Sequence, residues 1–196
     1  MICGLALVLL LDASASVPDH AWHAQVEAHA DALADPAIGR AMAAQGTTAV
    51  AVIGFSDTPR VMVPWRVVDA PEDAAAIARE VMAARRPGNA STYTAAALGY
   101  ALRYLDQAPC AGERRVIDLV TDGPSDDNSR IPAVRDALID ADVRLNVLAV
   151  NTYGAPVAAW AREEVVTPGG FVMEADAWQD VAWALRRKLA AEISQR

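Results

Sequence analysis

An uninterrupted apolar run near the start of the chain constrains the fold more than any other feature. Residues 5–11 are all apolar, and the run ends at Asp12. A strand that meets water on one face carries polar residues at alternate positions, whereas this run carries none, so it predicts a strand buried on both faces. Further strongly apolar stretches occupy residues 48–55, 115–121 and 143–150. The chain is therefore expected to build a mainly parallel sheet that helices cover on both sides.

Predicted strands and helices alternate along nearly the whole sequence. The strands are expected at residues 5–11, 48–55, 60–65, 115–121, 143–150 and 170–174, and the helices at 18–45, 70–84, 92–105, 132–141, 156–164 and 177–193. Short connections predict a doubly wound, Rossmann-like three-layer sandwich with a six-stranded sheet, in one domain that covers residues 1–196. The strand at 60–65 follows a short turn and contains Pro64, which predicts an antiparallel strand at one edge.

The charge balance argues against a nucleic-acid partner. Asp and Glu number 25 against 17 Lys and Arg, so the net charge is −8, whereas phosphate binding needs a concentrated basic surface. The densest basic clusters, Arg85-Arg86 and Arg186-Arg187-Lys188, lie near predicted helix ends, where the helix dipole favours cations, and we interpret them as solvated. Cys3 and Cys110 show no metal-ligand spacing and are expected to be reduced thiols.

The apolar run at residues 5–11 could also be mistaken for a secretion signal, because Ala-Ser-Ala-Ser follows Asp12. No Lys or Arg precedes the run, and cleavage after the alanines would remove the predicted central strand. No other apolar run approaches the length that spans a membrane. We therefore expect a cytoplasmic protein without a membrane partner, and secretion would require a longer precursor.

Oxygen-bearing side chains follow two of the predicted strands and precede one predicted helix. They are Asp12, Ser14 and Ser16 after the first strand, Thr92 at the helix entry, and Asp122 after a later strand. The carboxyl ends of parallel strands meet at one edge of the sheet, where open α/β folds bind ligands. Each residue alone is equally explained as a helix cap or an Asx-turn. Together they supply two carboxylates and three hydroxyls, which suit Mg²⁺ or Mn²⁺ and suit zinc poorly.

The same motifs resemble those of von Willebrand factor type A (VWA) domains. Asp12-Ala13-Ser14-Ala15-Ser16 matches the Asp-x-Ser-x-Ser element, Thr92-Tyr93-Thr94-Ala95 matches the Thr-x-Thr-Gly/Ala segment, and Thr121-Asp122-Gly123 matches Thr-Asp-Gly. The resemblance covers almost the whole chain. Val63-Pro64-Trp65 and Arg114-Arg115-Val116-Ile117-Asp118 resemble a bacterial subgroup of small VWA proteins.

The resemblance implies a metal-ion-dependent adhesion site (MIDAS) with a specific set of ligands. Its residues here would be Asp12, Ser14, Ser16, Thr92 and Asp122, some binding the cation directly and others through water. Thr94 is then expected to cap the helix that follows. Ala95 and Pro124 depart from the commoner family pattern, and Pro124 predicts a stiffer loop after the strand at 115–121.

Three other groups of residues could carry function. His20, His23 and His29 lie on one predicted helix but lack further zinc ligands. The stretch Asp126-Asp127-Asn128 could support a second cation, although a solvated loop is the preferred interpretation. The tryptophans are expected to fill the packing between helices and sheet, and any that is exposed near the site would suit a partner contact. They are Trp22, Trp65, Trp160, Trp178 and Trp183.

Two classes of function remain open. The first is a binding module, in which a Glu or Asp of a partner protein completes the coordination of Mg²⁺ or Mn²⁺; the resemblance implies a bacterial multi-protein system with a MoxR-like AAA+ ATPase, a protease or another effector encoded nearby. The second is a Mg²⁺-dependent hydrolase or phosphotransferase with Asp12 as nucleophile. Ser14 stands where such an enzyme would carry a second acid, and no lysine lies near either carboxylate in the sequence, so the binding module is favoured. A scaffold subunit with a vestigial metal site is a third possibility.

Overall fold

The central strand of the sheet is the apolar run that opens the sequence. The structure is a computed structural model that describes residues 2–152 and 157–194, with only the backbone at residues 2, 3, 111 and 112. Strand β2 (Leu5–Asp12) is buried along its whole length. It pairs in parallel with β3 (Thr48–Phe55) on one side and with β6 (Arg115–Thr121) on the other. Because two strands flank it and helices cover both its faces, no residue of β2 needs a polar side chain to meet water.

The predicted fold class is confirmed. The six-stranded sheet has the order β4-β3-β2-β6-β7-β8, with β7 (Val143–Val150) and β8 (Val172–Ala175) parallel to their neighbours. Strand β4 (Arg60–Val68) is the antiparallel edge strand. It continues past Pro64 because the pairing with β3 shifts register between Val63 and Arg66, so the missing N–H of the proline interrupts no ladder bond.

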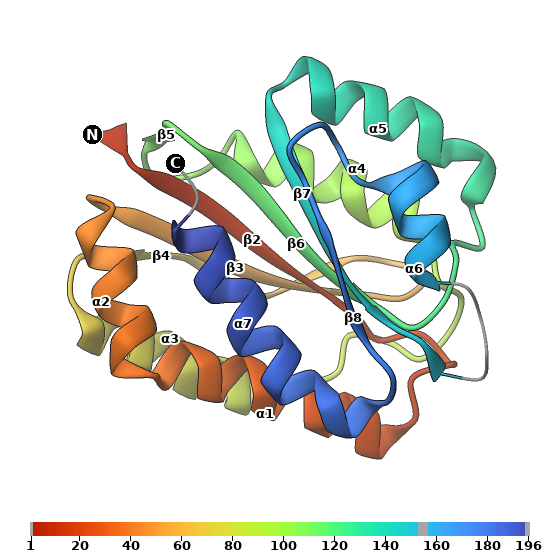
Figure 1. The fold of residues 1–196 in the computed structure, drawn as a ribbon, viewed down its shortest axis with the longest axis horizontal. Helices are drawn as coiled ribbons and strands as arrows, with labels where there is room; N and C mark the ends of the chain where they lie inside the picture. Colours follow the sequence, from red (N-terminus) through yellow and green to blue (C-terminus); the bar gives the residue numbers. More distant parts are fainter. Residues whose placement is uncertain (1, 153–156, 195–196) are drawn as a thin grey trace.

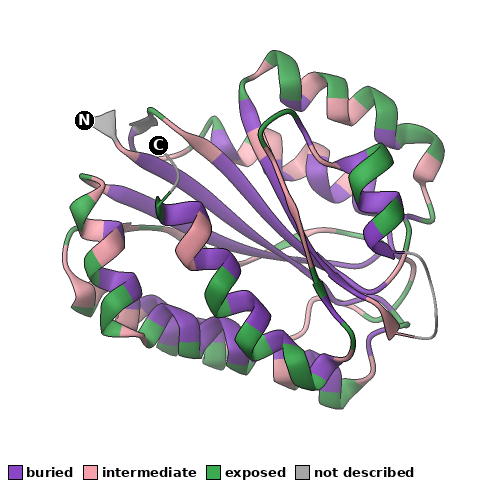
Figure 2. Cartoon of the chain, viewed as in Figure 1, coloured by how far each residue is buried: buried purple, intermediate pink, exposed green. Residues whose placement is uncertain are grey.

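Helices cover both faces of the sheet and make it the middle of three layers (Figure 1). One layer contains α1 (Asp19–Ala34), α2 (Pro36–Ala44), α3 (Pro71–Ala83) and α7 (Val181–Ser194). The other contains α4 (Thr94–Leu105), α5 (Ile131–Asp140) and α6 (Val157–Trp160), which a π-helical turn, Ala161–Val165, extends. Figure 2 shows buried residues along the strands and on the helix faces turned toward them. The two apolar cores lie between these layers.

Several predicted element boundaries were wrong. The single helix expected over residues 18–45 is two helices, broken at Asp35, whose ψ of 119° is extended. Pro36 disfavours helical backbone in the preceding residue, and the Asp35 side chain then caps α2 by accepting from Ala37 N at 2.8 Å. The last helix begins at Val181, after a 3₁₀ turn at Trp178–Asp180. A small parallel sheet of β1 (Ile2–Cys3) and β5 (Ala111–Gly112) was not predicted.

The expectation of reduced thiols was wrong for Cys110. This residue is disulfide-bonded, and its buried side chain packs against Ala49 and Trp65. Cys3 is the only other cysteine of the chain, and its side chain lies outside the part that the structure describes. Spacing alone gave no signal, because Cys3 and Cys110 are far apart in sequence while β1 and β5 are neighbours in space.

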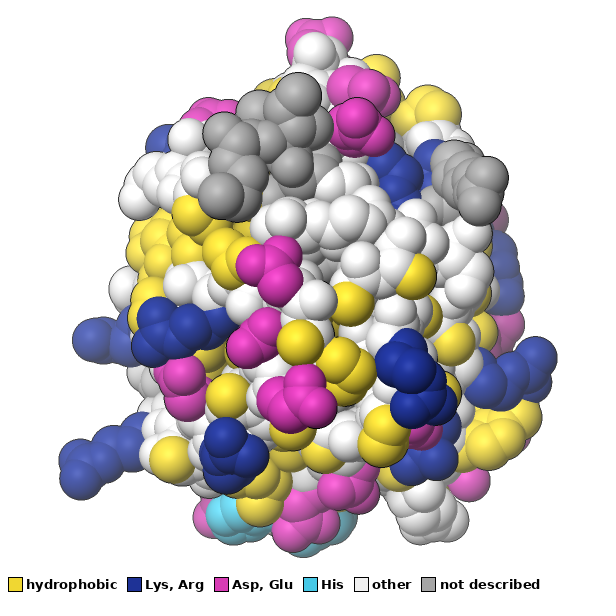
Figure 3. Space-filling model, turned by 90° about the vertical axis from the view of Figure 1, so that its left-hand side faces the viewer, with side chains coloured by type: hydrophobic (Ala, Val, Ile, Leu, Met, Phe, Trp, Pro, Cys, Tyr) yellow, Lys and Arg dark blue, Asp and Glu magenta, His cyan; other side chains and the backbone are white. Residues whose placement is uncertain are grey.

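Two further features are the polarity of the helices and the distribution of charge on one face. None of the described helices is both long and apolar enough to cross a membrane. On the face at the left of Figure 1, basic side chains are scattered and alternate with acidic ones instead of forming one dense patch (Figure 3). The described side chains of this face thus form no dense basic patch of the kind that binds phosphates.

Candidate metal centre

Asp12 is the buried anchor of the candidate site. It is the last residue of β2 and its side chain is fully buried. Its Oδ1 accepts a hydrogen bond from Ser14 N at 2.8 Å, and its Oδ2 accepts one from the Thr121 hydroxyl at 2.7 Å. Gln25 on α1 donates to the Asp12 backbone oxygen at 2.6 Å. Asp12 therefore forms the Asx-turn that its position after a strand also suggests. This turn directs the next side chains of the loop toward the end of β6.

Ser14, Ser16 and Asp122 form a continuous chain of polar contacts beside Asp12. The hydroxyl oxygens of Ser14 and Ser16 lie 3.1 Å apart, and Ser16 donates to Asp122 Oδ1 at 2.6 Å. These contacts join residues more than 100 positions apart because β2 and β6 are parallel neighbours that end at the same edge of the sheet. The other carboxylate oxygen of Asp122 is buried and accepts no hydrogen bond of normal geometry from the described residues, although the Trp178 indole is near enough to lower the pKa of Asp122 slightly.

Thr92 is held next to this group by its backbone. Thr92 N donates to Asp126 Oδ2 at 2.7 Å, and Thr92 O accepts from Asp126 N at 2.9 Å. The loop before it is joined to the serine loop, since Ala15 N donates to Ala90 O at 2.8 Å. Within the described part of the chain, no hydrogen bond links the Thr92 hydroxyl to the other four residues. The structure thus brings four predicted residues into mutual contact and places the fifth on an adjoining loop.

Burial without a neutralising side chain dominates the electrostatics of the two acids. It raises the pKa of Asp12 to about 6, although hydrogen bonds from Ser14 and Thr121 oppose the shift. Burial also raises the pKa of Asp122, against the opposing hydrogen bonds from the Ser16 hydroxyl and the backbone and the weaker effects of the Arg86 charge and the Trp178 indole. Among the described residues, no ion pair involves either acid. A cation bound between them would remove the unfavourable burial of negative charge.

The residues present fit a hard divalent cation. Ser14, Ser16 and Asp122 could hold it directly, and Asp12 and Thr92 could act through water. All five side chains offer oxygen atoms as ligands. Ser14 is buried and Ser16 is exposed, so the loop could supply ligands while one side stays open to an incoming group. Among the described residues, no three His, Cys, Asp or Glu side chains are placed so that they could hold a metal ion together. The site therefore depends on hydroxyl groups as much as on carboxylates.

The acidic stretch after β6 orders the backbone beside the site. Asp126 orients Thr92, and Asp127 accepts from Ala95 N at 2.9 Å and from Ala96 N at 3.0 Å, so it caps α4. The prediction that Thr94 caps this helix was wrong, since its hydroxyl is buried without a partner. The cap comes from a segment about 30 residues away, which local sequence patterns do not show.

The interpretation of Arg186-Arg187-Lys188 as a solvated cluster was wrong for Lys188. This residue, the only lysine of the chain, belongs to α7, and its side chain is fully buried. Its ammonium group contacts Asp118 of β6 and lies 2.7 Å from Glu192 Oε1. Asn146 of β7 donates to the same glutamate oxygen at 2.9 Å. Sequence reasoning also missed Arg86, whose side chain is only 14% exposed and contacts the serine loop.

The protein class follows from this fold and site together. Solved structures with the same fold include the von Willebrand factor type A protein of Catenulispora acidiphila, with a TM-score of 0.72 and 19% identity over 99% of this chain and 44% of that chain. Another is proximal thread matrix protein 1 of the mussel byssus with a zinc-occupied MIDAS motif, with a TM-score of 0.70 and 13% identity over 97% of this chain and 46% of that one. The chain has the fold of a VWA domain and spans less than half of either protein.

A third solved structure has the same fold, and a sequence family matches nearly the whole chain. Manganese-loaded TRAP protein of Plasmodium vivax has a TM-score of 0.57 and 18% identity, over 94% of this chain and 73% of that chain. No curated protein matches the sequence. Residues 2–196 match the family model described as "Protein of unknown function (DUF1194)", and the chain belongs to this family.

Proposed function

We propose that this protein is a divalent-metal-dependent protein-protein interaction module. Asp12, Ser14, Ser16, Thr92 and Asp122 hold Mg²⁺ or Mn²⁺, and a Glu or Asp of a partner protein completes the coordination. The observation that carries this proposal is the chain of contacts from Asp12 through the two serines to Asp122, which ends in a buried carboxylate oxygen without a partner. Such an oxygen costs free energy unless a cation or donor satisfies it.

The geometry of Asp12 favours this function over phosphoryl transfer or hydrolysis. A carboxylate nucleophile must present an oxygen to its substrate. Asp12 is fully buried, and each of its oxygens already accepts a hydrogen bond, from Ser14 N and from the Thr121 hydroxyl. The only lysine of the chain is engaged with Asp118 and Glu192 and so cannot stabilise a transferring phosphoryl group at Asp12.

The partner is a protein that presents an accessible carboxylate. The similarity to VWA proteins supports an adaptor or subunit role in a bacterial multi-protein system. The partners we put forward are a protease or another effector encoded nearby, and a MoxR-like AAA+ ATPase only if the labelling test below places the protein in the cytoplasm, where ATP is present. The test uses candidate partners purified singly, in binding titrations with Mg²⁺, with Mn²⁺ and with excess EDTA. Binding should require the cation and should be lost in Asp122→Asn. Equal binding in EDTA would contradict the metal bridge.

The disulfide at Cys110 leads us to propose an oxidising compartment in place of the cytoplasm expected from the sequence. Disulfides persist in secreted and periplasmic proteins and are rare where thiol reductants are abundant. Alkylation of the unfolded protein, taken from cells without reductant, tests this proposal. Cys110 should resist labelling until reductant is added. Full labelling without reductant would support the cytoplasm.

A further inference from the structure

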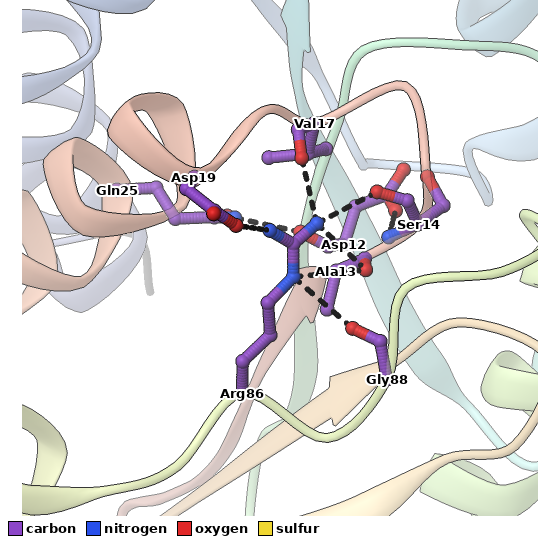
Figure 4. Close-up of polar contacts among 8 residues, drawn as sticks. All are labelled: Asp12, Ala13, Ser14, Val17, Asp19, Gln25, Arg86 and Gly88. Carbon is purple, nitrogen blue, oxygen red and sulfur yellow. Dashed lines mark hydrogen bonds and ion pairs between the residues drawn. The ribbon is translucent and has the colours of Figure 1, made fainter.

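Arg86 is not solvated, as its place in a basic cluster suggested, but binds backbone carbonyl groups beside the candidate site. It lies in the segment between α3 and α4, and its guanidinium group reaches into the loop that follows β2 (Figure 4). Nη2 donates to Ser14 O at 2.8 Å, to Val17 O at 2.6 Å and to Ala13 O at 3.0 Å. Three carbonyl groups of the loop that carries Ser14 and Ser16 thus converge on one nitrogen.

The other side of the guanidinium group holds the segment that carries Arg86 itself, which is the loop that leads to Thr92. Nε donates to Gly88 O at 3.0 Å, in the segment that leads to Thr92. Nη1 forms an ion pair with Asp19 at 2.9 Å, and the Trp22 ring lies 5.6 Å from Cζ. The planar fork of arginine can serve acceptors in several directions at once, whereas the single ammonium group of lysine cannot. Arg86 therefore ties the serine loop and the Thr92 loop to each other.

The acceptors that Arg86 uses leave the acids of the site available. Apart from Asp19, whose side chain is 86% exposed, the hydrogen-bond acceptors of Arg86 are uncharged carbonyl groups. No ion pair joins it to Asp12 or Asp122 in the described part of the chain. The arginine orders the loop while the carboxylates stay available for a cation.

We infer that Arg86 is a positioning residue that sets the affinity of this site for divalent cations. It does so by holding the backbone of the serine loop and of the Thr92 loop in one arrangement. This inference rests on the proposed function, because it concerns the same metal site. Residues that orient metal ligands typically change metal affinity by about 10- to 100-fold when they are replaced.

The experiment measures the Mn²⁺ affinity of the wild type and of variants of the full chain. Free Mn²⁺ is quantified by its electron paramagnetic resonance spectrum. Arg86→Gln and Arg86→Lys should bind at least about tenfold more weakly. Arg85→Gln is the matched control, because Arg85 is the exposed neighbour, and its affinity should stay within about twofold of the wild type. Unfolding midpoints in EDTA are measured in parallel, and if Arg86→Gln does not fold, Arg86→Lys decides the result.

Each outcome separates the two proposals. If the wild type binds Mn²⁺ and Arg86→Lys binds it equally well, Arg86 has only a structural role and the inference is wrong, even if the variant unfolds more easily. If the wild type binds no Mn²⁺, the proposed function fails and the inference fails with it. Added guanidinium ion, far below denaturing concentrations, should restore affinity to Arg86→Ala and leave Arg85→Ala unchanged.

Discussion

Two pairs of buried carboxylates lie on or beside the same strand, and only one pair has a cation from the chain. Asp118 lies in β6 and pairs with Lys188, which also contacts Glu192. Asp122 follows the same strand four residues later and, with Asp12, has no ion pair among the described residues. The first pair lies within the layers of the sandwich, and the second lies at the edge of the sheet beside the exposed Ser16.

The difference shows which charges the fold neutralises itself. Burial alone would lower the pKa of Lys188, but the charges of Asp118 and Glu192 outweigh it and raise the pKa. Burial and the charge of Asp118 raise the pKa of Glu192 well above its ordinary 4.5, and the ammonium group of Lys188 opposes that shift. The inner cluster thus contains a cation of its own. The edge cluster holds two acids that an external cation would balance, which is what distinguishes a binding site from a structural ion pair.

Replacing Lys188 should give the largest effect on stability. Lys188→Met keeps most of the apolar stem of the side chain but leaves Asp118 and Glu192 buried without a cation, and breaking such a group costs about 3–5 kcal/mol. Urea unfolding in EDTA measures the loss. Arg187→Met, at the exposed neighbouring position, should change the free energy of unfolding by less than about 0.5 kcal/mol. A Lys188→Met protein as stable as the wild type would contradict the structural role of the inner cluster.

Replacing Asp122 should remove stabilisation by metal and leave the apo protein intact. At a Mn²⁺ concentration of 100 times the dissociation constant, the wild type should gain about 2.7 kcal/mol in unfolding free energy. Asp122→Asn should gain none, and in EDTA it should be at least as stable as the wild type, because an uncompensated buried charge is gone. Thermal unfolding with and without Mn²⁺ measures both.

The control for that experiment is Asp140→Asn, at an exposed position at the end of α5. It should keep the full stabilisation by Mn²⁺. If Mn²⁺ stabilised Asp122→Asn as much as the wild type, the cation would bind elsewhere on the chain.

A smaller effect should appear in the pH dependence of the inner cluster. The folded protein raises the pKa of Glu192, so the stability that this group contributes is present below about pH 4.5 and is lost as the pH rises through the folded pKa. Glu192→Gln fixes the neutral form. Its unfolding free energy should therefore improve relative to the wild type as the pH rises above about 4.5. A difference that stays constant would show that folding does not raise the pKa of Glu192. Glu163→Gln, at an exposed position, is the control.

The sheet and most of the site could be predicted because they follow from patterns that are local in sequence. An unbroken apolar run predicts a central strand, and polar residues just after such strands meet wherever the strands are parallel neighbours. Asp12, Ser14, Ser16 and Asp122 obey this rule and lie in contact. The break at Asp35 was also within reach, since the residue before a proline seldom stays helical.

The supporting residues could not be predicted because their partners are defined only by the fold. Arg86 binds backbone carbonyl groups, which every residue carries, so no side-chain pattern points to it. Asp127 caps a helix that precedes it by about 30 residues. Lys188 stood in a basic run that resembled a solvated helix end, and the one available signal was that the chain has no other lysine.

Calorimetric titration of the purified wild type with Mn²⁺ and with Mg²⁺ shows whether the carboxylates of Asp12 and Asp122 form a metal site. We expect one saturable site per chain for each cation, reversal by EDTA, and no binding in Asp122→Asn, although this variant keeps Lys188 and its partners. Absence of saturable binding by the folded wild type, or binding that survives in Asp122→Asn, would contradict the claim that the edge carboxylates form a metal site.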